Sequence, residues 1–476
     1  MRRFWLKIEF GTDGWRGIIG EDYNFKNIKK IGKAVLNYLN KKPDILPFHK
    51  KKIIIGYDTR FLGKETALIL SDLFSNYGYD VLLSSSPIST PALSFSVLNF
   101  NLPIGIMITA SHNPAIYNGI KIKAWYGGSA LPEIYEGIKK SLNKKKLSKK
   151  GRGKVEEIDI KSYYLNYLKE NVDWEIIKKF NCKIIWDSMF GGTSEIVKYL
   201  FKEMGSNGVV LNSYPDPYFG GIQPEPIPKN IKKTIDYVKK HKPDLAGIAD
   251  GDGDRIGILT SDGYFLWNHT IFSLLAIYLI EEKNEKKGIA KTFSLSLYLD
   301  RISKKYNVPL IETPIGFKYL CPYLLKKEVS IAGEESGGIA FSNSLPERDA
   351  ILSFLKIIEM IALKKKSLLY FLKRLYTEFG KLNYGREDLN MEIERANAFV
   401  EEIYKNPPKE LCGFKISKVK KLDGVKLYFN DKGWLLFRAS GTENLLRVYC
   451  EMESQDQINE IFRFVKKYMI TNATNF

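Results

Sequence analysis

The strongest constraint on the fold is an alternation of short apolar runs with amphipathic stretches. Apolar residues recur at helical spacing over residues 25–39 and 66–77, and apolar runs of strand length occupy residues 53–57, 79–83 and 104–108. Helical stretches placed between such runs are typical of βαβ units, so the pattern predicts a mostly parallel sheet covered by helices. We therefore expect the N-terminal region to be an α/β domain.

The same alternation starts again after a lysine-rich segment at residues 139–154, which we interpret as a solvated linker. Strands are predicted at residues 183–187 and 245–249, with helices at 193–204 and 231–239. A third round begins at about residue 264 and opens with a helix through residues 271–279, followed by a strand at 329–332. These rounds predict two further α/β domains.

The pattern changes after residue 380. Residues 414–419 and 425–429 predict a hairpin, and strands at 434–437 and 445–450 precede a closing helix at 458–469. At 476 residues the chain is too long for one core. We predict three α/β domains with mixed, mostly parallel sheets and a C-terminal α+β domain, at residues 1–150, 151–263, 264–380 and 381–476.

Composition excludes several classes of function. The chain is 44% hydrophobic and 13% aromatic, as expected of a soluble globular protein. Its N-terminal residues lack the long apolar region of a signal peptide, and no stretch is long enough to span a bilayer, so we expect a cytoplasmic protein without a membrane partner. The net charge of +19 is spread along the chain with no recognisable nucleic-acid fold, so we expect no nucleic-acid partner. Four distant cysteines without a CxxC pair indicate neither a zinc site nor a disulfide framework.

A serine lies just beyond one of the predicted strands. The segment TASHNP at residues 109–114 follows the apolar run 104–108. In open α/β sheets, ligands bind beyond the carboxyl ends of the strands, which makes Ser111 a candidate nucleophile. An ordinary turn is the alternative, because Ser, Asn and Pro are also turn residues.

The sharpest chemical signal is the hexapeptide DGDGDR at residues 250–255, after the predicted strand 245–249. Three carboxylates at alternate positions, separated by glycines that let the backbone curl, can point at one centre and need a hard cation such as Mg²⁺. An EF-hand would need Gly and Glu where this chain has Arg255 and Ser261. Open positions on the ion would suit a phosphate oxygen and water, and an acidic turn without metal is the alternative.

Other segments rich in glycine or proline predict loops, at residues 10–17, 215–226, 313–319 and 333–338. In GEESGG at 333–338, two carboxylates and a hydroxyl suit hydrogen bonds to a polyol, because sugar hydroxyls both donate and accept. A tight turn explains the same residues. In RASGTEN at residues 438–444, with Arg447 just beyond, a guanidinium, hydroxyls and backbone N–H groups have the inventory of a phosphate clamp.

Together, TASHNP, DGDGDR, GEESGG and RASGTEN resemble the loops of the α-D-phosphohexomutase family, which includes phosphoglucomutases, phosphomannomutases and phosphoglucosamine mutases. The motifs stand in the family's order at about its spacing, and the resemblance spans nearly the whole chain. It implies four domains around a central cleft, three of related α/β type and a fourth α+β.

The resemblance also implies roles for the motif residues. Ser111 would carry the transferable phosphoryl group, and Mg²⁺ would be bound by that phosphoserine together with Asp250, Asp252 and Asp254. Catalytic roles near the transfer site are implied for His112, Lys121, Arg255 and Arg16, with His112 and Lys121 the candidates for proton transfer. Contacts to the sugar and to the non-reacting phosphate are implied for Lys318, Glu334, Ser336, Arg438, Ser440, Gly441, Thr442 and Arg447.

The implied reaction interconverts hexose 1-phosphate and hexose 6-phosphate through a hexose 1,6-bisphosphate, which would also act as activator. Positioning and charge neutralisation catalyse such transfers, which suits loops that supply metal, Arg and Lys rather than a catalytic triad. GEESGG resembles the phosphoglucomutase type, so glucose is favoured over the alternatives of a phosphomannomutase or a dual enzyme, and glucosamine phosphate is less favoured. We expect a monomer or homodimer. The rival readings are a metal-dependent phosphatase and an anion-binding protein, and the latter has no use for three clustered aspartates.

Overall fold

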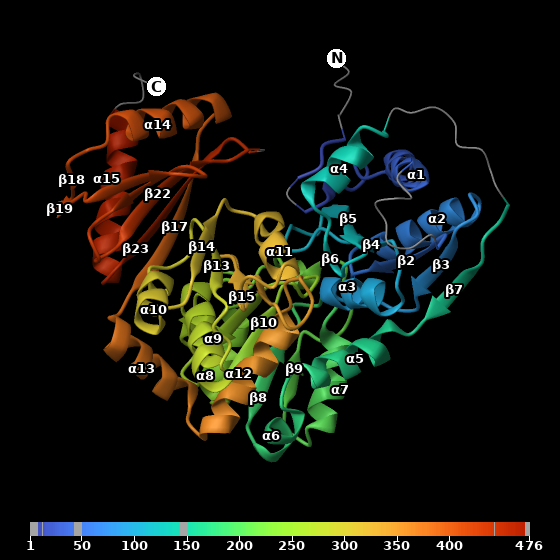
Figure 1. The fold of residues 1–476 in the computed structure, drawn as a ribbon, viewed down its shortest axis with the longest axis horizontal. Coiled ribbons are helices and arrows are strands. Elements are labelled where there is room, and N and C mark those ends of the chain that lie inside the picture. The colour runs from blue at the N-terminus through green and yellow to red at the C-terminus, as the bar shows by residue number, and fades with distance from the viewer. Residues whose placement is uncertain (1–7, 12, 42–49, 143–150, 442, 472–476) are drawn as a thin grey trace. The chain divides into compact units, whose positions relative to one another are not determined.

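The computed structural model describes residues 8–11, 13–41, 50–142, 151–441 and 443–471, and the chain divides into two compact units (Figure 1). Unit 1 comprises residues 1–268 and 316–368, and unit 2 comprises residues 269–315 and 369–476. Among the described residues, no helix is both long and apolar enough to cross a membrane. The division into four domains at the positions given above stays a prediction.

The first sheet of unit 1 contains β1 (Trp15–Ile18), β2 (Lys52–Tyr57), β3 (Asp80–Ser84), β4 (Ile104–Ile108), β5 (Tyr117–Ala124), β6 (Gly128–Ser129) and β7 (Val155–Ile158). Its order is β1-β5-β4-β2-β3-β7, with β6 paired to β5. Strands β4, β2, β3 and β7 are parallel, whereas β5 runs antiparallel to both β4 and β1. The accompanying helices are α1 (Phe25–Lys41), α2 (Gly63–Ser75), α3 (Thr90–Asn99) and α4 (Pro132–Lys139). The predicted elements of this region are confirmed with shifts of a few residues at their ends.

The expectation of a loop over residues 10–17 is wrong in part, because Trp15–Ile18 forms strand β1. Glycine makes this pairing possible: a Cβ on Gly119 of β5 would lie only 2.4 Å from the Trp15 carbonyl oxygen. Glycine content alone argued for a loop, but here the missing side chain lets two strands approach.

The second sheet of unit 1 contains β8 (Ile184–Asp187), β9 (Val209–Leu211), β10 (Leu245–Ala249), β11 (Ile256–Leu259) and β12 (Phe265–Leu266), in the order β12-β11-β10-β8-β9. Its neighbouring helices are α5 (Ile160–Glu170), α6 (Trp174–Lys179), α7 (Ser194–Glu203), α8 (Lys232–His241) and α12 (Ala350–Lys364), and α12 packs against β10. Strands β10 and β11 form an antiparallel pair, so residues 250–255 are its connection. The loop predicted at residues 215–226 contains one 3₁₀ turn at Phe219–Gly221.

Unit 1 also contains α11 (Phe317–Leu325) and the antiparallel pair β15 (Ile331–Gly333) and β16 (Ile339–Phe341). The last three residues of the loop predicted at 313–319 therefore belong to a helix. Residues 334–338 join β15 to β16, as a loop at a strand end should.

Unit 2 has a small α/β part and an α+β part. The first contains the parallel strands β13 (Ile289–Thr292) and β14 (Leu310–Thr313), with α9 (Asn268–Glu282), α10 (Tyr298–Tyr306) and α13 (Leu368–Phe379). The second is an antiparallel sheet of β17 (Asn383–Asn390), β23 (Leu445–Met452), β22 (Trp434–Ala439), β21 (Val425–Tyr428) and β20 (Lys418–Lys421), in that order.

Two helices, α14 (Ile393–Lys405) and α15 (Gln455–Thr471), pack on one face of this sheet and share its apolar core. Alternate residues of the strands enter that core, for example Leu435 and Phe437 of β22, so the predicted α+β domain is confirmed. The predicted strand 414–419 is divided, because β19 (Phe414–Lys415) pairs with β18 (Glu410–Leu411). The chain changes partner at Ile416, whose N–H donates to Lys409, whereas the next N–H donates to Tyr428.

Candidate active site

Ser111 lies just beyond β4 in a strained backbone conformation. It is buried and has a φ of 55°, which is uncommon for a residue with a side chain. Its Oγ donates to Asp250 Oδ2 at 2.7 Å, and its N–H donates to Thr109 Oγ1 at 2.9 Å. The serine hydroxyl is therefore aimed at the aspartate loop.

A buried arginine from the turn after β2 holds the Ser111 segment in this shape. Arg60 donates to four backbone carbonyl oxygens at 2.5 to 3.0 Å, those of Ser111, Asn113, Pro114 and Tyr117. Asp58 lies 3.3 Å from the Arg60 guanidinium and accepts a hydrogen bond from Thr109 at 2.5 Å. Because the guanidinium presents several donors in a rigid plane, one side chain fixes several carbonyl groups.

The three aspartates of DGDGDR converge as predicted. Their side chains are fully buried, and one carboxylate oxygen from each lies within 4.8 Å of the others. Asp250 Oδ1 accepts from the N–H groups of Asp254 and Arg255, at 3.0 and 3.1 Å, which curls the loop around this carboxylate. Gly253 has a φ of 73°, a conformation that favours glycine, so the turn depends on this residue type.

The aspartate set fits a divalent cation. Asp252 Oδ1 and Asp254 Oδ1 are buried and have no hydrogen-bond partner among the described residues. Burial and repulsion from the other two carboxylates raise the pKa of Asp250 well above its usual range. Three converging oxygen donors with unpaired oxygens are the ligand type that Mg²⁺ prefers.

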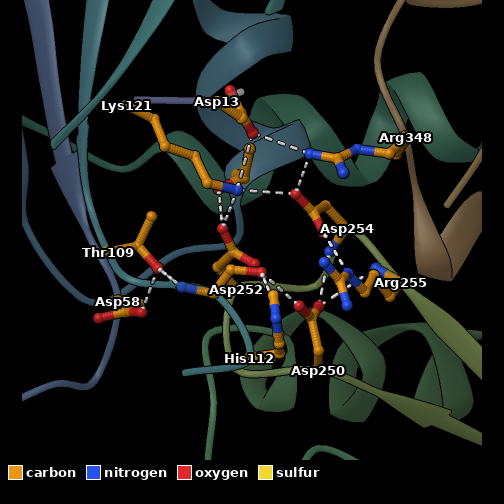
Figure 2. Close-up of polar contacts among 12 residues, drawn as sticks. Asp13, Asp58, Thr109, His112, Lys121, Asp250, Asp252, Asp254, Arg255 and Arg348 are labelled. Atoms are coloured by element: carbon orange, nitrogen blue, oxygen red, sulfur yellow. Dashed lines mark hydrogen bonds and ion pairs between the residues drawn. The ribbon is translucent and has the colours of Figure 1, made fainter. Parts of the chain in front are cut away.

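Lys121 of β5 is the main cation beside the aspartates. Its Nζ lies 2.7 Å from both Asp252 and Asp254 and 3.2 Å from Asp13, and Figure 2 shows these carboxylates pointing at the ammonium. Burial lowers the pKa of Lys121, but the three carboxylates outweigh it and the net pKa is raised. Lys121 is therefore a fixed positive charge at this position.

The remaining residues expected near the transfer site also lie in unit 1. His112 Nδ1 is 3.4 Å from Ser111 Oγ, and burial and the positive charge of Arg255 hold the pKa of His112 well below its usual range. Arg16 donates to Asn113 Oδ1 at 2.7 Å. Arg255 lies 3.6 Å from Glu225 and 4.0 Å from Asp254. The structure thus brings the five expected catalytic side chains to one region.

Glu334 of GEESGG is buried beside the aspartate loop. Its Oε2 accepts a hydrogen bond from Arg348 at 3.1 Å, and burial raises its pKa although Arg348 opposes the shift. Ser336 is half-buried on the same loop. Lys318 lies in the first turn of α11, where its ammonium is 5.1 Å from the Tyr319 ring centroid.

The expected phosphate clamp belongs to unit 2. Arg438 of β22 and Arg447 of β23 are direct cross-strand partners, so their side chains extend from adjacent positions on the two strands. Arg438 pairs with Asp423 at 3.1 Å, and Arg447 with Glu443 at 2.6 Å. Ser440 is buried and accepts from the Glu443 N–H at 3.2 Å, and Gly441 is exposed. Thr442 lies outside the described residues.

Sequence reasoning missed several residues that contact these side chains: Asp13, Asp58, Arg60, Thr90 and Arg348. Thr90 begins α3 and donates through Oγ1 to Asp252 Oδ2 at 2.6 Å, and its N–H donates to the Asp252 carbonyl at 2.7 Å. Asp58 and Arg60 follow a predicted strand, the same signal that marked Ser111. For Arg348 no local signal existed.

Comparison with known proteins identifies the family. Four phosphoglucomutase/phosphomannomutase profiles match in order: alpha/beta/alpha domain I at residues 7–149, domain II at 162–263, domain III at 267–379 and the C-terminal domain at 394–467. The chain belongs to the α-D-phosphohexomutase family. It is accordingly a mutase, as the four motifs implied.

Full-length relatives of this phosphohexomutase carry different sugars in their names. The phosphoglucomutase/phosphomannomutase of Thermococcus kodakarensis is 32% identical over 458 residues, covering 95% of this chain and 96% of that protein. The phosphoglucosamine/phosphogalactosamine mutase of Sulfurisphaera tokodaii is 31% identical, covering 96% and 98%. The crystal structure of a protein assigned as a phosphomannomutase from Thermus thermophilus matches with a TM-score of 0.86 at 30% identity, covering 97% of this chain and 99% of that one. The family is therefore shown, and the relatives differ in the sugar that their names give.

Proposed function

We propose that this phosphohexomutase interconverts hexose 1-phosphate and hexose 6-phosphate, with glucose as the preferred sugar, through phosphoserine at Ser111 and a hexose 1,6-bisphosphate. The observation that most supports this proposal is the hydrogen bond from Ser111 Oγ to Asp250, which is one of three converging buried aspartates. A serine so close to a carboxylate cluster suits phosphoryl transfer only if a cation balances the charge.

Asp250, Asp252 and Asp254 would hold Mg²⁺, which when bound supplies charge neutralisation for phosphoryl oxygens. Around it, Lys121, Arg16 and Arg255 add fixed positive charge, and Arg60 keeps the serine segment rigid. In the transfer, the Ser111 O–P bond breaks as the sugar hydroxyl oxygen bonds to phosphorus, the sugar hydroxyl loses its proton to a base, and the Ser111 oxygen takes up a proton. His112 Nδ1, 3.4 Å from Ser111 Oγ, would exchange a proton with the serine oxygen, whereas Lys121 is enclosed by carboxylates.

Two further groups complete the proposed cycle. Glu334 and Ser336 would bind ring hydroxyls, and Lys318 is a weaker candidate for the same role. Arg438, Ser440, Gly441, Thr442 and Arg447 would hold the phosphate that does not react. The bisphosphate would then turn over and return its other phosphoryl group to Ser111, which releases the isomeric hexose phosphate.

The proposal is tested by intact mass after incubation with glucose 1,6-bisphosphate and Mg²⁺. Wild type should gain one phosphoryl group, and Ser111→Ala should gain none. Ser96→Ala is the matched control, since Ser96 is a buried serine of α3 whose hydroxyl donates to the Ala92 carbonyl. A gain of one phosphoryl group in Ser111→Ala would contradict the assignment of Ser111 as the nucleophile. Release of free phosphate at the rate of substrate loss would show a phosphatase instead.

The sugar is tested separately. Wild type should show a higher kcat/KM for glucose 1-phosphate than for mannose 1-phosphate or glucosamine 1-phosphate. A higher kcat/KM for mannose 1-phosphate would support the phosphomannomutase alternative, and equal values for mannose and glucose 1-phosphate would support the dual enzyme. Neither result would contradict the mutase reaction. The highest kcat/KM for glucosamine 1-phosphate would contradict the preference for glucose and would agree with the name of the Sulfurisphaera relative.

A further inference from the structure

Arg348 joins three carboxylates that come from distant parts of unit 1. Its Nη2 lies 2.6 Å from Asp254 and 2.8 Å from Asp13, and its Nη1 lies 3.1 Å from Glu334. Figure 2 shows the guanidinium between Asp13 and Asp254. One buried side chain therefore connects the aspartate loop to the GEESGG loop.

The surroundings are shaped for this arginine. Its guanidinium carbon lies 5.2 Å from the Phe317 ring centroid, and the next residue, Asp349, caps α12 by accepting from the Leu352 N–H at 2.9 Å. A Cβ on Gly338 would lie 2.3 Å from Arg348 Cδ and 3.2 Å from Glu334 Oε2. The last glycine of GEESGG thus leaves the space through which Arg348 reaches Glu334.

We propose that Arg348 is a positioning residue that holds the Glu334 carboxylate in place for hexose recognition. The inference rests on the proposed function, which assigns sugar contact to Glu334. A charged hydrogen bond from a planar guanidinium fixes both the position and the orientation of a carboxylate. Because the same guanidinium is anchored on Asp254 and Asp13, it cannot follow Glu334 if that side chain turns away. Substrate hydroxyls therefore meet a carboxylate that is already oriented, which lowers the entropy lost on binding.

A double-mutant cycle tests the inference. Arg348→Met keeps an unbranched side chain and removes the charge, and we expect KM for glucose 1-phosphate to rise about tenfold or more, while kcat also falls because the guanidinium contacts Asp254. In a Glu334→Gln background, the same substitution should change KM by less than about threefold, because there is no carboxylate left to orient. The KM of Arg348→Lys should lie between the values for wild type and Arg348→Met, since an ammonium restores the charge without the planar guanidinium.

Lys123→Met is the matched control for loss of a buried cation from the same network. Lys123 pairs with Glu347 at 2.7 Å and lies 3.6 Å from Asp13. We expect this variant to lose thermal stability and keep the wild-type KM. An unchanged KM in Arg348→Met, an equal KM change with and without Glu334, or the same KM rise in Lys123→Met would each overturn the inference. A wild type that interconverts no hexose phosphate would instead contradict the proposed function, and the inference with it.

Discussion

Each unit buries a cluster of charged side chains, and the two clusters are built differently. In unit 1, three aspartates from one six-residue loop converge on one another, with Lys121 beside Asp252 and Asp254 and Arg348 beside Asp254. In unit 2, the corresponding groups come from four different strands: the buried Lys291 of β13, Lys426 of β21 and Glu451 of β23, and the partly buried Glu312 of β14.

Lys426 is the centre of the unit 2 cluster. Its Nζ donates to the Phe293 carbonyl at 2.6 Å, lies 4.1 Å from the Trp434 ring centroid and is 3.9 Å from Glu312. Burial and the nearby ammonium of Lys291 lower the pKa of Lys426 to about 7, although Glu312 opposes the shift. An ammonium enclosed by an aromatic ring and a carbonyl is a packing arrangement.

The difference shows that buried charge alone does not mark an active site. The unit 1 cluster has converging carboxylates with two oxygens lacking partners among the described residues, and a serine hydroxyl aimed at it. The unit 2 cluster has its central cation held by surrounding protein groups. The feature that indicates a ligand-binding site is a group of charges of one sign whose oxygen atoms lack hydrogen-bond partners among the described residues.

The largest expected effect is on the unit 1 cluster. Asp252→Asn removes one of three carboxylates and one of the partners of Lys121, and we expect kcat to fall by about 10³-fold or more in saturating Mg²⁺. Calorimetry should show weakened Mg²⁺ binding while the thermal transition persists. Asp262→Asn is the control, because Asp262 is exposed beyond β11. Near-normal turnover in Asp252→Asn would contradict the metal assignment and remove the contrast between the clusters.

A smaller effect is expected for the support of Ser111. Arg60→Met removes the donor to four carbonyl groups and leaves the buried Asp58 carboxylate unpaired. We expect a loss of about 3–5 kcal/mol in the free energy of unfolding and about 10²-fold in kcat/KM. Chemical denaturation and steady-state kinetics measure the two.

The double variant Asp58→Asn with Arg60→Met separates these effects. It should regain stability, because no unpaired charge remains, and stay impaired in kcat/KM, because the carbonyl groups still lack their donor. Recovery of both would show that Arg60 acts only on stability.

The smallest effect on activity is expected in unit 2. Lys426→Met should leave kcat/KM unchanged, and at pH 7 it should be as stable as wild type or more stable, because burial and Lys291 disfavour this ammonium in the folded state. The pKa of Lys426 is about 7 in the fold against an ordinary value of 10.5, so the unfolded chain binds more protons between these values. The free energy of unfolding of wild type should therefore rise with pH across this window and be insensitive to this group below it.

In Lys426→Met this contribution disappears, so the stability difference between wild type and variant should change steadily from pH 7 to 10. Denaturation curves at several pH values give that difference directly. A difference independent of pH, or a loss of turnover, would show that the unit 2 cluster is more than packing.

The sequence by itself determined the features that are local in the chain. Short apolar runs predicted β4 and β10, and the residues just beyond them, Ser111 and Asp250, proved to be hydrogen-bonded. The DGDGDR loop was readable because glycines between carboxylates act within six residues. The prediction failed at β1, where the distant strand β5 decided the outcome, and at the strand 414–419, which is divided because its first residues pair with the nearby β18.

Only the tertiary structure decided which charges meet. Arg348 contacts Asp13 across 335 positions of sequence and Asp254 across 94, and Lys426 contacts Phe293 across 133. Such contacts leave no periodicity or motif, because each side chain satisfies the pattern of its own strand or loop whichever partner it meets. The partner is chosen by the packing of elements, since a buried charge is tolerated only where the fold brings it an opposite charge or a polar group.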